Sequence, residues 1–393
     1  MARTRADVAK EPYRELTDRE LNAKLRQFDT RFKRLEDQYL RMIGEQLRSI
    51  GTLAPSDVHR LEQMNIMHGN LRTIEHRIAV LTGSTAEEID ELLRACAQTD
   101  ARIATKILGI KSIPNVRDNT YLMRILNAQI KETAGTLVNL SNTTVVSTFY
   151  RRAVDEAVQA VVTGVEDYNS AIRRVVREAG RSGLRVTDKG VTKVDYESGY
   201  SRRLDTAARM NVLDGMRHMN QDILNAVGDE FGANGVEIDA HMMCADDHLP
   251  YQGRQYTDKE FEKLQESLDR PFGEWNCRHV WHRIIIGVSP RLYSDEQLAE
   301  MRDYSTERIK IDGHTKSRYE WSQEMRRTET AIRQQKDTAN LAMASGDEEL
   351  RKRCQGMVLQ LDRYYDQITE ASGIDPDYGR MYVAGFKDIN AKE

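Results

Sequence analysis

The stretch "LTDRELNAKLRQFDTRFKRLEDQYLRM", residues 16–42, decides the fold class of this chain. Thr17 can cap the start of a helix, and Glu20 can reach back to the backbone amide of Thr17. Leu16 can pack against Leu21, one turn inside the helix. Apolar residues then recur in alternating steps of four and three, which keeps one stripe of a helix facing a partner helix. The stripe consists of Leu21, Leu25, Phe28, Phe32, Leu35, Tyr39 and Met42. The stretch therefore predicts a long amphipathic helix that packs against other helices.

The same helical pattern of apolar residues continues toward residue 180. A second helix is expected over residues 56–83, with a stripe that includes Met67, Leu71 and Ile74. In the next stretch, "STAEEIDELL", Thr85 and Glu88 match a capping box and predict a new helix start after a short turn. Further helical periodicity runs through residues 119–140 and 147–180. These segments predict antiparallel helices joined by short turns.

The texture changes at residues 183–199, "GLRVTDKGVTKVDYESG", where glycines break short β-branched runs. This stretch predicts a small hairpin or an extended linker and marks a domain boundary. The elements expected after it are a helix over residues 200–232, strands over 234–241 and 279–288, and a hairpin over 308–317 that turns on Asp312 and Gly313.

Two further helices are predicted at the end of the chain, separated at Gly346 and Asp347. The second of them is expected to carry its apolar stripe on Leu350, Cys354, Met357, Leu361, Tyr364 and Ile368. The pattern predicts a closing helical hairpin.

These elements together predict a mainly α protein. The expected units are an elongated, coiled-coil-like helical bundle over residues 1–183, a small α+β module with His- and Cys-rich loops over 184–316, and a C-terminal helical hairpin and tail over 317–393. A composition of 39% hydrophobic and 31% charged residues suits such an elongated helical protein better than one compact globule.

Charge and cysteine usage exclude several classes of protein. The net charge of -4 is small for 393 residues, so the whole molecule is not committed to nucleic acid or to a membrane surface. Four cysteines without framework spacing argue against a disulfide scaffold and favour a reducing compartment. No run approaches the ~18 apolar residues that a membrane helix needs, and the polar start lacks a secretory signal. The chain is expected to be soluble and made without secretion.

Histidines and cysteines gather in two loops, "HMMCADDHLPYQG" (241–253) and "NCRHVWH" (276–282). Zinc takes four nitrogen or sulfur ligands, often as two pairs from separate loops. The pairs would be His241 with His248 and Cys277 with His279, and the spare candidates are Cys244 and His282. Zinc is therefore the one cofactor that the sequence suggests.

Two other interpretations of these loops stay open. The side chains could hydrogen-bond one another as an internal brace, together with Asp246, Asp247, Gln252, Asn276 and Arg278. A cysteine beside a histidine also contains the residue types of a nucleophile and its base, but nothing in the loops resembles a nucleophile signature. We therefore expect no enzyme activity and assign no catalytic residue.

A basic span crosses the predicted domain boundary. Residues 173–203 hold nine Lys or Arg against four acids. Such a stripe could contact DNA phosphates or an acidic protein partner. The candidate contact residues are Arg173, Arg174, Arg177, Arg181 and Arg185.

Residues 190–385 resemble the phage minor capsid protein 2 family, which is related to the Mu F-type head morphogenesis proteins. The most specific parts of the resemblance are the His241 and His248 pair, the Gln252-Gly253 step and the run from Asn276 to His279. The resemblance implies a minor structural component of a tailed bacteriophage head, placed inside the capsid at or near the portal vertex. Its implied partners are portal protein, major capsid protein and packaged double-stranded DNA, with several copies per virion and assembly in the host cytoplasm. No catalytic residues come with this family.

One alternative function belongs to a different class. The chain could be a metal- or cysteine-dependent enzyme that is packaged in the virion and delivered with the genome. This alternative requires bound metal or a reactive thiol in the loops at 241–253 and 276–282.

Overall fold

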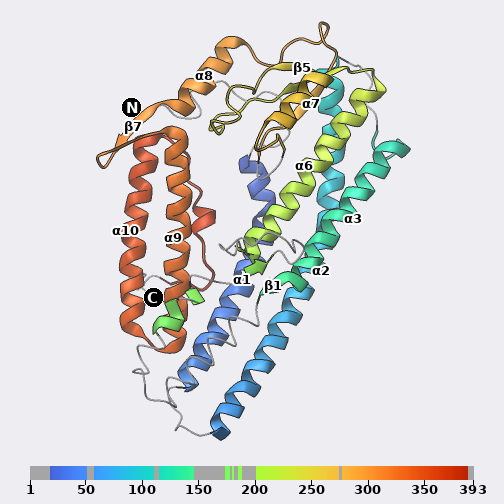
Figure 1. Ribbon diagram of the computed structural model, residues 1–393. Coiled ribbons are helices and arrows are strands. Elements are labelled where there is room, and N and C mark those ends of the chain that lie inside the picture. The colour runs from blue at the N-terminus through green and yellow to red at the C-terminus, as the bar shows by residue number, and fades with distance from the viewer. Residues whose placement is uncertain are drawn as a thin grey trace.

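A computed structural model of the chain confirms the mainly α class (Figure 1). It describes residues 18–50, 57–109, 115–145, 173–177, 179–180, 185–187, 201–273 and 277–387. The element order from the N-terminus is α1 (Asp18–Ile50), α2 (Asp57–Ile107), α3 (Thr120–Thr143), β1 (Thr144–Val145), β2 (Arg185–Thr187), β3 (Ser201–Arg203) and α6 (Leu204–Glu230).

Helix α1 forms where the opening stretch predicts it. Its stripe is buried at Leu25, Phe32, Leu35 and Tyr39, and these side chains join a core that α1 shares with α2, α3 and α6. Figure 1 shows these four helices as long rods that run along one another. The predicted cap at Thr17 lies outside the described residues.

Helix α2 corrects the prediction of a break near residue 83. It is one helix of 51 residues that passes through Gly83 without interruption. The Thr85 hydroxyl, expected to cap a new helix, instead donates to the Leu81 carbonyl oxygen at 2.8 Å. Ile78 and Ile89 on either side of the glycine are both buried in the same core. Packing that continues across Gly83 outweighs the signals in the sequence for a helix end and a new helix start. The Thr85 hydroxyl does not require a helix start, because inside a helix it can bond the carbonyl oxygen one turn back.

Helix α6 packs along α2 and α3 within the same core. The approach to α3 is close, because a Cβ added at Gly215 would lie 2.1 Å from the Thr133 hydroxyl oxygen. The shared core therefore extends past the boundary predicted after residue 183, and the division into three units stays a prediction. Strands β1, β2 and β3 form an antiparallel sheet at this boundary, in line with the extended structure expected for residues 183–199.

A small α+β module follows α6. Its elements are β4 (Gly235–Ile238), β5 (Gln255–Thr257), α7 (Asp258–Ser267), β6 (Trp281–Ile284) and α8 (Asp295–Thr306). Strand β4 lies between β5 and β6 and is antiparallel to both. Strands β4 and β6 are the two strands expected from the sequence. In Figure 1 the module sits at the upper end of α6, and α8 leads from it toward the C-terminal hairpin.

The C-terminal region confirms the predicted hairpins. It contains β7 (Arg308–Ile311), β8 (His314–Ser317), α9 (Arg318–Ser345), α10 (Glu348–Ser372) and the 3-10 helix η2 (Tyr378–Met381). Asp312 and Gly313 both have positive φ, as a tight two-residue turn requires. Gly346 ends α9 in the left-handed conformation, and Asp347 caps α10 by accepting the Leu350 amide at 3.0 Å.

The apolar stripe of α10 differs from the prediction at two positions. Met357 is 40% exposed, whereas its neighbour Val358 is buried. Likewise Tyr365 is fully buried and donates its hydroxyl to Glu329 on α9 at 2.9 Å, while Tyr364 is only partly buried. Steps of three and four allow either neighbour at these points, and contacts with α9 select the second one.

Buried ion pairs join the C-terminal hairpin to the N-terminal helices. Arg203 lies between Glu36 of α1, at 2.6 Å, and Asp337 of α9, at 2.5 Å. Arg333 of α9 pairs with Asp205 of α6 at 2.6 Å. Together these five residues form the buried ionic network. Among the helices that the structure describes, none combines the length and hydropathy needed to cross a bilayer.

A buried carboxyl on α2 makes the stability of the bundle depend on pH. Asp100 is fully buried and accepts a hydrogen bond from the Asn220 amide of α6 at 2.6 Å. Burial raises the pKa of the Asp100 carboxyl to about 7, against the opposing effect of this hydrogen bond. The ordinary value, which the unfolded chain retains, is 3.8. The native state therefore holds a proton that the unfolded state has lost between about pH 4 and pH 7, so this carboxyl lowers stability as the pH rises through that window.

We expect Asp100→Asn to raise the free energy of unfolding by roughly 1–3 kcal/mol at about pH 8 and by much less at about pH 4, because the amide keeps the hydrogen bond and never ionises. Urea unfolding followed by circular dichroism at both pH values measures the difference. Asp118→Asn, at an exposed position before α3, is the matched control. A gain of equal size at both pH values would contradict the assignment.

Candidate metal centre

The two His- and Cys-rich loops meet because contacts between the two segments continue after the last residue of β4 and before the first residue of β6. The Asp239 amide donates to the Val280 carbonyl oxygen at 2.9 Å. In return, the Val280 amide donates to Asp239 Oδ1 at 2.9 Å. This pairing brings the segment that leads into His241 beside the segment that carries His279, and the centroids of these two imidazole rings are 4.3 Å apart.

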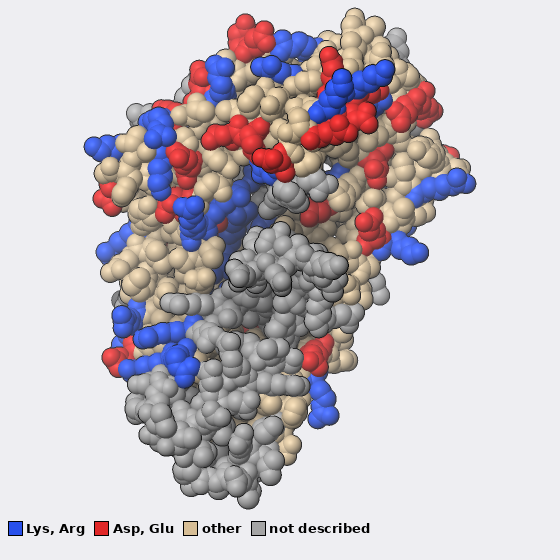
Figure 2. Space-filling view, in the orientation of Figure 1, with Lys and Arg blue, Asp and Glu red and all other residues tan. Residues whose placement is uncertain are grey.

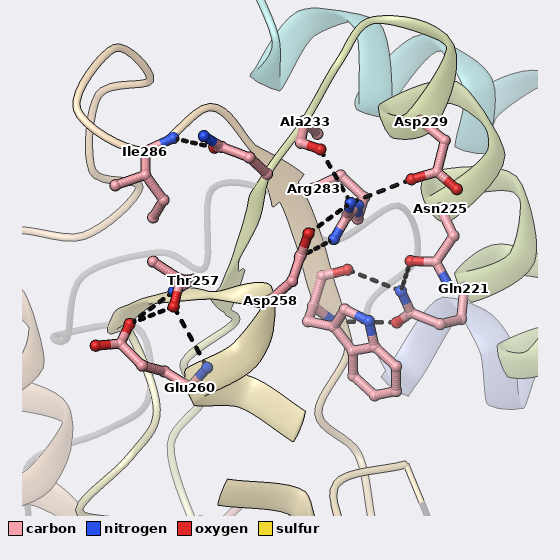
Figure 3. A network of polar contacts seen from close by, with 11 residues as sticks. Gln221, Asn225, Asp229, Ala233, Thr257, Asp258, Glu260, Arg283 and Ile286 are labelled. Carbon is pink, nitrogen blue, oxygen red and sulfur yellow. Dashed lines mark hydrogen bonds and ion pairs between the residues drawn. The ribbon is translucent and has the colours of Figure 1, made fainter. Parts of the chain in front are cut away.

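Side chains of α6 fix the position of β6 (Figure 3). The Gln221 amide donates to the Trp281 carbonyl oxygen at 3.0 Å and accepts the Trp281 amide at 3.1 Å, so it pairs with the strand as another strand would. Arg283 reaches from β6 to Asp229 at 3.1 Å, to the Ala233 carbonyl oxygen and to Asp258. The sheet therefore cannot slide along α6 without breaking several polar contacts.

The loop after His241 is held by a bond within the loop and by a bond to α8. The His248 amide donates to the Ala245 carbonyl oxygen at 3.0 Å, and Met243, with φ 63°, donates its amide to the Ser305 hydroxyl at 2.9 Å. On the outside, Arg270 forms two hydrogen bonds to the exposed carboxylate of Asp247, at 2.7 and 3.0 Å. These contacts turn His248 inward, where its side chain is 1% exposed.

Five buried side chains form the resulting cluster, in two groups that share His279. In the first group, Cys277 Sγ lies 3.4 Å from His248 Nδ1 and 3.3 Å from His279 Nδ1. In the second group, Cys244 Sγ lies 3.6 Å from His279 Nε2, and His241 is the third member. Each group uses a different ring nitrogen of His279.

Acceptor groups outside the cluster orient the rings. His248 Nε2 lies 2.7 Å from the Arg270 carbonyl oxygen, and the His248 ring stacks on Phe272 at 4.2 Å. Gln252 Oε1 lies 3.2 Å from His279 Nε2 and also accepts the His241 amide at 3.1 Å. Metal-binding histidines commonly have such carbonyl partners on the ring nitrogen that faces away from the metal.

The two thiols sit in different electrostatic surroundings. Burial raises the pKa of Cys244 far above its ordinary value, and the neighbouring Cys277 raises it further. Burial also raises the pKa of Cys277, but the backbone amides of Gly273 and His279 oppose that shift. Neither thiol has the exposed, electropositive setting of a reactive cysteine, so a nucleophilic role is disfavoured.

The structure places the four predicted zinc ligands close together but in two different groups. His248, Cys277 and His279 share one group, whereas His241 lies in the other. The spare candidate Cys244 joins the group of His241, and His282 lies in β6 opposite Glu237, outside both groups.

The brace interpretation finds part of its partners in the structure. Gln252 bonds both loops, Asp247 bonds Arg270 on the surface, and Asp246 is exposed. Asn276 lies outside the described residues. Sequence reasoning missed Phe272 and the Arg270 carbonyl group, because neither carries a metal-binding signal.

The basic candidates divide as well. Arg173 pairs with Asp347 and Glu349 at the start of α10, both at 2.6 Å, while Arg174 and Arg177 are exposed. Arg181 lies outside the described residues, and Arg185 pairs in register with Val145 and Arg203 in the sheet of β1, β2 and β3. Their contact with DNA or an acidic partner stays a prediction.

Comparison with known protein families places most of the chain within one of them. The profile of the family described as Phage minor capsid protein 2 matches residues 16–367. No curated protein and no solved structure matches the chain. The matched range includes α1 at one end and most of α10 at the other, with all five side chains of the cluster between them.

We expect the four cysteines to resist alkylation in the folded protein, because all four are buried. In native protein at about pH 7.5, each should react with iodoacetamide at least about 100-fold more slowly than after unfolding in guanidinium chloride. Peptide mass spectrometry measures the rate at each site, and the unfolded sample is the control. Rapid native labelling of Cys244 or Cys277 would instead indicate the reactive thiol that a cysteine-dependent enzyme requires.

Proposed function

The chain belongs to the phage minor capsid protein 2 family, and we propose that it acts inside the head of a tailed bacteriophage, at or near the portal vertex. Family membership makes it a structural component of the virion. The position at the portal, the contact with portal protein and major capsid protein, and a copy number of several per virion belong to the proposal.

The shape of the helical part supports a role that links partners. A helix of 51 residues is about 75 Å long, and α2 has this length in one uninterrupted element. Helices α1, α3 and α6 pack along it, so the rod is supported over much of its length. A long, laterally supported helix holds the groups at its two ends at a fixed separation, as an assembly component between two partners must do.

The distribution of charge on the surface favours local contacts with other virion components. It does not favour attraction of the whole molecule by its net charge. Figure 2 shows basic and acidic side chains interspersed over the upper part of this face of the molecule. With a net charge of -4, overall electrostatics would not draw the protein onto DNA. A DNA contact therefore has to be local, and the exposed Arg174 and Arg177 are the described residues of the basic span that can make it. Arg173 is less suited to this role, because it holds the start of α10.

The enzyme alternative has less support. A structural capsid family suggests a protein without enzymatic activity. Both thiols are also buried, away from the exposed, electropositive setting in which a catalytic cysteine is found.

We expect purified phage particles to contain this chain in a few copies, since one vertex carries the portal. Quantitative mass spectrometry of gradient-purified heads, calibrated against the major capsid protein, measures the copy number. Cross-linking in intact heads should join lysines of this chain to portal protein, with particles from a deletion mutant as the blank. Absence of the chain from purified heads would end the structural proposal, and presence without portal cross-links would end the proposed position.

We expect the double variant Arg174→Glu, Arg177→Glu to weaken binding to double-stranded DNA and to lower the slope of log affinity against log salt by about 2. Fluorescence anisotropy with a labelled duplex at several salt concentrations measures both. Arg302→Glu, an exposed arginine of α8, is the matched control. Equal affinity and slope in the wild type and the double variant would exclude this contact.

A further inference from the structure

We propose that His248, Cys277 and His279 bind one Zn²⁺ ion, through the two Nδ1 atoms and the sulfur. The proposal concerns the folding of the module and does not depend on the position of the protein in the virion. It differs from the ligand set that the sequence suggests, because it leaves out His241. The orientations of the His248 and His279 rings favour this smaller set.

The distances between the three atoms fit a zinc site. With Zn–S near 2.3 Å and Zn–N near 2.05 Å, two tetrahedral ligands lie about 3.6 Å apart. Cys277 Sγ lies 3.4 Å from His248 Nδ1 and 3.3 Å from His279 Nδ1. All three ligand atoms lie within 4.8 Å of one another, and their side chains are at most 4% exposed. An ion can therefore enter with small shifts of the side chains.

The outer partners leave the correct nitrogen available on both rings. A backbone carbonyl oxygen only accepts, so His248 Nε2 must carry the hydrogen that it shares with the Arg270 carbonyl oxygen. Gln252 Oε1 accepts the His241 amide, which identifies this atom as the oxygen and makes it an acceptor for His279 Nε2 as well. With the hydrogen on Nε2, each neutral ring directs the lone pair of Nδ1 toward Cys277 Sγ.

A metal ion satisfies this arrangement better than a thiol does. The Cys277 thiol carries one hydrogen and can donate it to one of the two Nδ1 atoms at a time. A zinc ion accepts the lone pairs of both nitrogens and of the sulfur together. The backbone amides of Gly273 and His279 face the sulfur, as donors to a metal-bound thiolate do.

The group of His241, Cys244 and His279 is less suitable. It needs the lone pair of His279 Nε2, the nitrogen whose hydrogen goes to Gln252. In addition, Cys244 Sγ donates to the Ala245 carbonyl oxygen at 3.3 Å, which keeps it as a thiol. Cys244 is therefore left outside the proposed ligand set.

The ion would connect the loop that follows β4 to the segment that precedes β6. Because an intact ligand set exists only in the folded module, metal binding would contribute directly to its stability. Removal of the ion should lower the melting temperature of the module while leaving the helical content of the long bundle largely in place.

The full-length protein, expressed with added zinc and desalted, should carry about one zinc ion per chain by elemental mass spectrometry. Cys277→Ser and His248→Asn should each reduce the content below about 0.1 ion per chain. Cys244→Ser and His282→Asn, a buried thiol and a buried imidazole outside the proposed ligand set, are the matched controls and should keep the wild-type content. Circular dichroism checks that all variants keep their helices.

Cobalt provides a measurement that does not depend on any variant folding. Wild-type protein freed of zinc by a chelator and titrated with Co²⁺ should gain the thiolate-to-metal charge-transfer band and the visible bands of a tetrahedral site. Wild-type protein with less than about 0.1 zinc per chain and without the thiolate band would overturn the proposal. Loss of metal in Cys244→Ser with retention in Cys277→Ser would overturn the assignment of the ligands.

Discussion

A buried ionic network fixes how the C-terminal hairpin docks on the N-terminal helices. Arg203 lies between Glu36 and Asp337, and Arg333 pairs with Asp205, so α1, α6 and α9 each contribute a carboxylate or a guanidinium at a place where water is excluded. Burial raises the pKa of Glu36 to about 7 despite Arg203. Burial acts in the same direction on Asp205, but Arg333 and Arg203 outweigh it and hold that pKa at about 2. Such a network adds little net stability, but loss of one partner costs roughly 3–5 kcal/mol. A shift of α9 by one turn would separate these partners, so the network selects a single register.

Helix α6 links the buried ionic network to the His and Cys cluster. This helix is preceded by Arg203 and carries Asp205 in its first turn, and near its other end Gln221 and Asp229 hold β6. Strand β6 in turn follows directly on the segment that holds Cys277 and His279. Helix α6 is therefore the element through which the docking of the hairpin and the position of the cluster are related. Its apolar residues lie in the shared core along α2 and α3, which keeps the connection rigid.

Local chemistry made part of the fold predictable. The turn at Asp312 and Gly313 and the helix end at Gly346 follow from backbone preferences of the residues themselves. The break expected at Gly83 was wrong, because burial on both sides of a helical glycine is a tertiary effect that a short window does not contain. The ionic network was missed for a similar reason, since Glu36 and Asp337 are far apart in the sequence. At the cluster, the spacing of strand ends predicted which side chains gather. Their division into two groups depends on ring orientation, and a main-chain carbonyl and Gln252 set that orientation.

The position of the cluster follows from the size of the module. Its apolar residues divide into two small cores, one around Phe261 and Phe272 and one around Tyr293 and Met301. Cores of this size bury too little apolar surface to order the long loop between β4 and β5. Cys277 belongs to the first core and Met242, next to His241, belongs to the second, so the imidazoles and thiols lie where the two cores meet. Polar groups at that place cross-link segments that apolar packing alone would leave loose, and a bound ion would strengthen the same links. For a capsid component, whose function depends on keeping its shape among neighbours, this stabilising role is sufficient reason for a buried cluster.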